Sequence, residues 1–119
     1  MHHFSVTKEY PFPASKMWSV FSDFSRSSTP SATITLLEPG DPENNHIGAI
    51  RQTTIGKDAF REELIDYEPG RSLTYKLLSG APVDQYYGTI TIHPHGDTEA
   101  EVEWSIRCKP QFPIPGWLI

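Results

Sequence analysis

The sequence predicts an α+β fold with one helix after the first strand and an antiparallel sheet of six to seven strands. Two observations predict it. Segments of about eight residues alternate polar and apolar side chains between glycine-containing turns, which is typical of an antiparallel meander. One stretch near the N-terminus instead has apolar residues at helical spacing. The chain has 119 residues, so we expect a single domain over 1–119.

The first strand and the helix follow from side-chain spacing. Phe4, Val6 and Tyr10 share one parity and alternate with polar residues, which predicts a half-buried strand. Proline neighbours end this strand, and Pro13 suits the first turn of a helix, where its missing N–H is not needed. The helix is predicted over 13–26, with an apolar face made of Met17, Trp18, Phe21 and Phe24.

The rest of the chain is predicted to be strand and turn. A proline- and glycine-rich loop over 38–45 separates the first of these strands from the others. The predicted strands are 33–37, 48–55, 59–67, 72–79, 85–93 and 99–109. Alternation indicates one covered and one solvated face. In the last strand the covered side consists of Ala100, Val102, Trp104, Ile106 and Cys108.

The hairpin after the long loop has a predicted register. A three-residue turn at 56–58 pairs Ile55 with Ala59. The same register sets Arg51 opposite Glu63 on the outer face, where the opposite charges support it. We expect this exposed ion pair to contribute little to stability.

On the inner face, this register gives the clearest functional hint. It places Gln52 opposite Glu62, and Glu62 between Phe60 and Leu64 on the apolar side. An unpaired buried carboxylate is costly, so Glu62 requires a partner, a proton or a solvated cavity. The alternative is a different register that leaves Glu62 exposed to solvent.

Charge and cysteine content exclude several classes of protein. Fifteen acidic and ten basic residues give a net charge of −5, so the positive surface that binds nucleic acid is not expected. The single cysteine cannot form an internal disulfide. We see neither a secretion signal nor an apolar run of the roughly 18 residues that span a membrane. We therefore expect a soluble cytoplasmic protein.

Metal and cofactor motifs are not evident. His93, His95 and Asp97 lie near one turn, but turn histidines are commonly solvated and no further ligand has zinc spacing. Cys108 has inward parity, which favours an inert buried thiol. We find no phosphate-binding loop, nucleotide fingerprint or nucleophile elbow. The expectation is no metal and no cofactor.

Residues 12–25 (FPASKMWSVFSDFS) resemble the first helix of the polyketide cyclase/dehydrase and lipid-transport proteins. These belong to the SRPBCC superfamily, which shares the helix-grip fold of START and birch-pollen-allergen proteins. Further matches follow in order over nearly the whole chain, at 48–51, 61–66, 82–87 and 101–105. The resemblance implies a curved antiparallel sheet wrapped around a long C-terminal helix, with a ligand cavity between them.

Two departures from the family pattern affect this expectation. The family often has an aromatic residue before a proline after the first helix, whereas this chain has Ser-Ser-Thr-Pro at 27–30. The long C-terminal helix is also missing, because the sequence stops at 115–119, where it would begin. We therefore expect a domain without most of that helix, in which another element covers the inner face unless the chain is shortened.

The resemblance also implies site residues. Glu62, Tyr86 and Trp104 match the strand-motif glutamate, the tyrosine and the last-strand tryptophan of the family. For the aromatic residues, including Tyr75, core packing with a satisfied polar tip is the simpler interpretation. The predicted ligand-binding set is Gln52, Phe60, Glu62, Leu64, Tyr75, Tyr86, Ile90 and Trp104.

Three hypotheses for function follow. The first is binding of a hydrophobic small molecule or lipid between sheet and helices, oriented by Glu62, Tyr75 and Tyr86. The second is a polyketide cyclase/dehydratase-type enzyme in which Glu62 is general acid or base, although no second catalytic group of matching strength is visible. The third is a protein-interaction module or homodimer that uses the sheet face.

Overall fold

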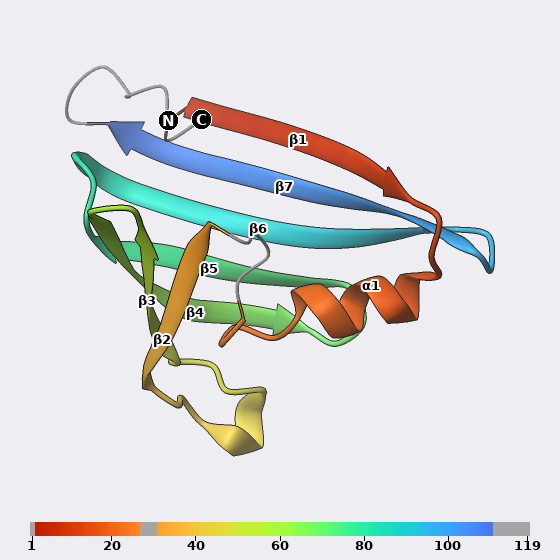
Figure 1. Cartoon of the computed structure of the whole chain (residues 1–119), viewed down its shortest axis with the longest axis horizontal. Coiled ribbons are helices and arrows are strands. Elements are labelled where there is room, and N and C mark those ends of the chain that lie inside the picture. The colour runs from red at the N-terminus through yellow and green to blue at the C-terminus, as the bar shows by residue number, and fades with distance from the viewer. Residues whose placement is uncertain (1, 27–30, 111–119) are drawn as a thin grey trace.

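The computed structural model describes residues 2–26 and 31–110, which form seven strands and one α-helix (Figure 1). The helix α1 spans Ala14–Phe21, and a short 3₁₀ turn, η1, spans Pro42–Asn44. The strands are β1 His2–Tyr10, β2 Ala32–Glu38, β3 Ile50–Ile55, β4 Asp58–Glu68, β5 Ser72–Ser79, β6 Val83–His95 and β7 Glu99–Pro110. Stretches 27–30 and 111–119, which carry the two departures from the family pattern, lie outside the described residues.

All seven strands form one antiparallel sheet, in the order β1-β7-β6-β5-β4-β3-β2. The first strand therefore pairs with the last, and the others follow as a meander (Figure 1). The sheet curves, and α1 lies on its concave side against β6 and β7. This confirms the predicted α+β helix-grip architecture; a long C-terminal helix is absent from the residues that the structure describes.

The helix is shorter than the predicted 13–26 because the chain turns away after Phe21. The N–H of Ser22 donates to the carbonyl of Trp18 at 2.8 Å and closes the last turn. The carboxylate of Asp23 then accepts from the backbone N–H and the hydroxyl of Ser25, at 3.0 and 2.6 Å. Such local side-chain bonds compete with continued helix. Phe24 still reaches the core, where it is buried.

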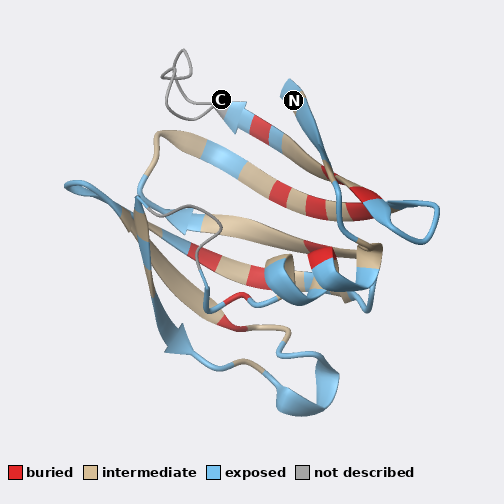
Figure 2. Cartoon of the chain, turned by 45° about the vertical axis from the view of Figure 1, so that its right-hand side comes forward, coloured by how far each residue is buried: buried red, intermediate tan, exposed pale blue. Residues whose placement is uncertain are grey.

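The core lies between α1 and the concave face (Figure 2). The predicted inward parity of β6 and β7 is confirmed, since Ile90, Ile92, Ala100 and Val102 are all buried. Other core members come from α1, the turn after it, the residue that precedes β3, and strands β4 and β5: Met17, Phe24, Ala49, Leu64 and Leu73. Part of the apolar surface of the chain stays outside this core, and Val6 on β1 remains 64% exposed.

The predicted register of the β3–β4 hairpin is wrong by one residue. Ile55 pairs with Asp58, so the turn has two residues and Gly56 occupies its first position with a φ of +60°. Two-residue turns of this kind match the twist of the strands that they join, which favours them over longer loops. The shift places Arg51, not Gln52, opposite Glu62.

Candidate functional site

The site is built around a carboxylate on the concave face. Glu62 of β4 is the one buried charged residue among those described. Its Oε1 lies 3.1 Å from Nε of Arg51 and accepts from the hydroxyl of Thr53 at 2.8 Å. Both partners come from β3 and share the face of Glu62, because side chains at alternate positions of a strand point the same way. Glu62 is therefore buried with the partners that a charge requires.

Arg51 is held between aromatic rings. Its guanidinium carbon lies 4.1 Å from the ring centre of Phe24 and 5.2 Å from that of Tyr75. Nη1 also donates to the carbonyl of Phe24 at 3.2 Å. Cation–π contacts strengthen when they are desolvated, and only 14% of the Arg51 side chain is exposed. The turn after α1 is thus connected to β3 through one side chain.

Tyr75 of β5 lies across the glycine of the neighbouring strand. It pairs with Gly88 of β6, and a Cβ added at Gly88 would stand 2.7 Å from Cε2 of the tyrosine ring. Glycine is therefore required for this placement. Burial, followed by the charge of Glu62, raises the pKa of the Tyr75 hydroxyl well above its ordinary value of 10, and Arg51 opposes the shift only in part. Tyr75 is consequently a neutral hydrogen-bond donor near Glu62.

Tyr86 of β6 provides a second neutral hydroxyl on the same face. Burial raises its pKa to about 12, with smaller contributions from Glu62 and Cys108. Cys108 lies opposite Tyr86 on β7 and is itself buried, which raises the pKa of the thiol. Such a thiol is poorly reactive, as its parity predicted.

Two cavities lie on either side of the Phe24–Arg51 stack. The smaller, about 190 Å³, has five polar lining residues, and the rest of its lining consists of apolar side chains of α1, β2, β3 and β6. The polar residues are Arg26, Arg51, Thr53, Glu62 and Tyr75. The larger, about 500 Å³, is lined by Phe24 and Leu64 and by the loop between β2 and β3. The lining of the larger cavity does not include Glu62, but it contains polar side chains of its own, among them Asp23, Asn45 and His46.

The structure brings together part of the predicted ligand-binding set. Glu62, Tyr75 and Ile90 line the smaller cavity, and Leu64 lines the larger one. Phe60 and Tyr86 lie on the concave face outside both linings, and Trp104 packs edge-on against Phe21, with 5.5 Å between ring centres. Gln52 lies on the opposite face, where its Oε1 accepts from Arg61 at 3.4 Å.

Sequence reasoning missed the partners of Glu62. Arg51 was expected on the outer face with Glu63, but Lys76 lies beside Glu63, at 3.7 Å, and Arg51 points inward. The predicted ligand-binding set does not include Thr53. The signal that could have found both is Gly56, since glycine at the first position of a two-residue turn fixes the observed register.

The group of potential metal ligands lies apart from the cluster of Glu62, Arg51 and Thr53. Among the residues described, one group of three has suitable atoms close together, namely Glu9, His95 and Glu101 on the outer face of the sheet. Separately, no helix within 2–26 or 31–110 is long and apolar enough to cross a bilayer.

Solved structures with the same architecture show how widely this fold occurs. A protein from Bacillus thuringiensis matches with a TM-score of 0.79 and 18% identity, covering 98% of this chain and 84% of its own. A START superfamily protein from Mycobacterium smegmatis matches with a TM-score of 0.76 and 17% identity, over 99% and 83% of the two chains. Norcoclaurine synthase from Thalictrum flavum, in complex with a transition-state analogue, matches with a TM-score of 0.74 and 16% identity, over 92% and 76%.

Identity at this level establishes the fold alone. No curated protein sequence matches the chain. The sequence model of the family described as polyketide cyclase/dehydrase and lipid transport matches residues 1–119. The chain therefore belongs to the polyketide cyclase/dehydrase and lipid transport family.

Proposed function

We propose that this protein binds a hydrophobic small molecule or lipid on the concave face of its sheet, with a polar group of the ligand held at Glu62. The observation that carries the proposal is a buried carboxylate, bonded to Arg51 and Thr53, at the wall of a cavity whose remaining lining is largely apolar. Ligand sites commonly combine an apolar lining with a few polar groups in this way.

Stability alone explains the cluster poorly. Desolvation offsets most of the attraction in a buried ion pair, and apolar residues of similar volume are often as stable or more so. Ligand binding would explain why charged residues are buried here. Both hydrogen bonds of Glu62 go to Oε1, so Oε2 has none of them and is available to a ligand. A donor group of the ligand can approach the other carboxylate oxygen, and Tyr75 lines the same cavity.

The protein also offers an apolar surface for the apolar part of the ligand. Val20 and Ile55 line the smaller cavity and are 37% and 45% exposed, so the cavity opens between apolar side chains. Its volume of about 190 Å³ holds one end of a ligand, since complete pockets usually measure roughly 300–1,000 Å³. We therefore expect an amphipathic ligand whose polar end enters the cavity and whose apolar body covers this rim.

The binding test is thermal stabilisation by a panel of fatty acids, sterols and aromatic polyketide-like compounds, followed by titration calorimetry of any that stabilise. Wild type is expected to bind at least one of them, and Glu62→Gln to bind it at least about tenfold more weakly, since a lost charged hydrogen bond costs roughly 1.5–3 kcal/mol. The matched control is Glu63→Gln, the next residue of β4 on the opposite face, which should bind as wild type does.

No stabilisation by any compound in the panel would count against ligand binding itself. Equal binding by wild type and Glu62→Gln would instead remove Glu62 from the site and leave binding intact. A self-associating chain would lend weight to the sheet-face interaction hypothesis, so the mass in solution is measured in the same samples.

A catalytic role is the second candidate, because Glu62 and the neutral Tyr75 hydroxyl line one cavity. Such a pair can move a proton and polarise a carbonyl. Turnover of a bound polyketide-like compound that is lost in Glu62→Gln while binding is retained would support an enzyme. Retention of turnover in that variant would exclude Glu62 as the acid or base.

A further inference from the structure

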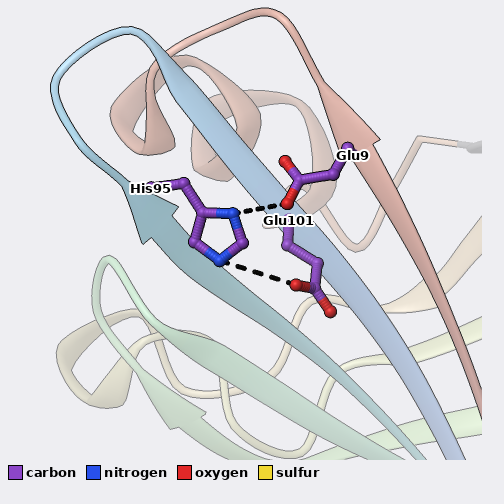
Figure 3. A group of neighbouring side chains, drawn as sticks. All are labelled: Glu9, His95 and Glu101. Carbon is purple, nitrogen blue, oxygen red and sulfur yellow. Dashed lines mark ion pairs between the residues drawn. The ribbon is translucent and has the colours of Figure 1, made fainter.

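Two glutamates and a histidine meet on the outer, solvent-facing side of the sheet, across β1, β7 and β6 (Figure 3). Glu9 of β1 lies directly opposite Glu101 of β7. The ring of His95, at the end of β6, contacts both: Nδ1 touches Oε1 of Glu9, and Nε2 lies 3.5 Å from Oε2 of Glu101. One ligand atom from each residue lies within 4.8 Å of the others.

Two carboxylates of this group lie side by side. Like charges directly opposite one another on paired strands are destabilising, and Glu9 and Glu101 are such a pair. A cation bound between the two carboxylates would offset their repulsion. The ring of His95, which contacts both glutamates, offers a nitrogen ligand beside their oxygens.

We propose that Glu9, His95 and Glu101 form a site for a divalent transition-metal cation of the Zn²⁺ type. Zn²⁺ accepts both imidazole nitrogen and carboxylate oxygen as ligands, whereas Ca²⁺ and Mg²⁺ prefer oxygen alone. Bonds of about 2.0–2.2 Å in a tetrahedral site place donor atoms roughly 3.4 Å apart. Side chains that are 53%, 46% and 27% exposed reach this spacing by small rotations and leave a position for water.

The neighbours of this group on the same face include Glu99, which lies opposite His95, and His93, which lies opposite Glu101. His93 precedes His95 by two residues on β6, but its Nε2 lies 2.8 Å from Oε1 of Glu103. Oε2 of Glu103 also accepts from the hydroxyl of Ser5 at 3.1 Å. This second histidine–glutamate pair is therefore self-contained and supplies the matched control.

Metal binding would connect the edge strand to the interior of the sheet. Glu9 belongs to β1, which is mostly exposed and pairs only with β7 among the described strands, whereas His95 belongs to β6 beyond it. A metal ion that binds only the folded state raises the stability of the folded protein.

The test uses the full chain, freed of metal with EDTA and dialysed, and titrated calorimetrically with ZnCl₂ at pH 7.5. Wild type is expected to bind one Zn²⁺, with a rise in Tm and with Co²⁺ absorption bands of a four-coordinate site. His95→Ala and Glu101→Gln should each weaken binding by more than about tenfold. His93→Ala should bind as wild type does.

Several results would overturn the site. They are the absence of saturable binding by wild type, equal loss in His93→Ala, and unchanged binding in both ligand variants. Glu9→Gln replaces His95→Ala if the latter does not fold, as judged by circular dichroism. CaCl₂ and MgCl₂ are titrated in parallel, and equal affinity for them would exclude an imidazole ligand. The site is independent of the proposed ligand function, because it lies on the other face of the sheet.

Discussion

Arg51 and Glu62 face each other across β3 and β4, with Nε and Oε1 3.1 Å apart and with only 14% and 11% of their side chains exposed. The pair lies on the apolar side of the sheet, where water cannot replace either partner fully. Neither residue can therefore be removed alone without leaving a charge that has lost its counter-charge.

The first prediction concerns this pair. Arg51→Met keeps the apolar stem but leaves Glu62 without its cation, and we expect a loss of about 2–4 kcal/mol in the free energy of unfolding. Urea denaturation measures it. Arg51→Met/Glu62→Met should recover part of that loss, because no isolated charge remains. Lys76→Met, which breaks the exposed pair with Glu63, should cost less than about 1 kcal/mol. Equal losses of unfolding free energy in Arg51→Met and Lys76→Met would contradict this prediction.

The second prediction concerns Gly88. Gly88→Ala places a methyl group inside the space of the Tyr75 ring, so we expect destabilisation of about 1–3 kcal/mol. In a Tyr75→Ala background the same substitution should be almost neutral, because the obstacle is gone. A double-mutant cycle from urea denaturation measures the coupling. Additive effects would show that the Tyr75 ring does not require this glycine.

The third prediction concerns alkaline pH. The pKa of Tyr86 is raised to about 12 from 10, and that of Tyr75 is raised as well, so the folded state holds these protons more tightly. Their contribution to stability is complete below the unfolded value near 10 and is lost as the pH rises toward 12. Tm between pH 8 and 11.5 should fall less steeply in Tyr75→Phe/Tyr86→Phe than in wild type. Parallel curves would contradict this.

The fourth prediction concerns the partition between the cavities. Phe24 is buried and lines the larger cavity, while the Arg51 guanidinium stacked on its ring lines the smaller one. Phe24→Ala should lower the free energy of unfolding by about 3–5 kcal/mol and join the two cavities. The variant should then bind bulky ligands more tightly, relative to small ligands, than wild type does. Phe12→Ala, at a side chain that is 39% exposed, is the control and should alter neither property. Unchanged ligand size preference in Phe24→Ala would exclude a joined cavity.

Local patterns predicted most of the fold. All seven strands were expected, and the inward parity of β6 and β7 is confirmed, because alternation reports directly on which side is buried. The end of α1 was not predicted, since hydrophobic spacing continues to Phe24 while Asp23 and Ser25 form a competing turn. Arg51 pairs with Glu62 because the turn has two residues, whereas a three-residue turn would pair Gln52 with Glu62. The apolar pattern of the hairpin hardly distinguishes these two turn lengths.

The group formed by Glu9, His95 and Glu101 was beyond sequence reasoning for another reason. In the sequence, the neighbours of His95 are His93 and Asp97, whereas Glu9 lies near the other end of the chain. Only the pairing of β1 with β7 brings these carboxylates together, and no local spacing encodes that pairing. Ligand sets that cross strands distant in sequence become visible only once the sheet order is known.

The same pairing of the first strand with the last has a kinetic consequence. His2 lies opposite Cys108, so β1 must wait for an edge formed on the order of a hundred residues later in the chain. During synthesis β1 and α1 emerge first, yet their partners β6 and β7 emerge last. Assembly can begin in the hairpins of the meander, while docking of the N-terminal segment completes the concave face. Formation of the concave face, where ligand binding is proposed, is thus coupled to the most non-local step of folding.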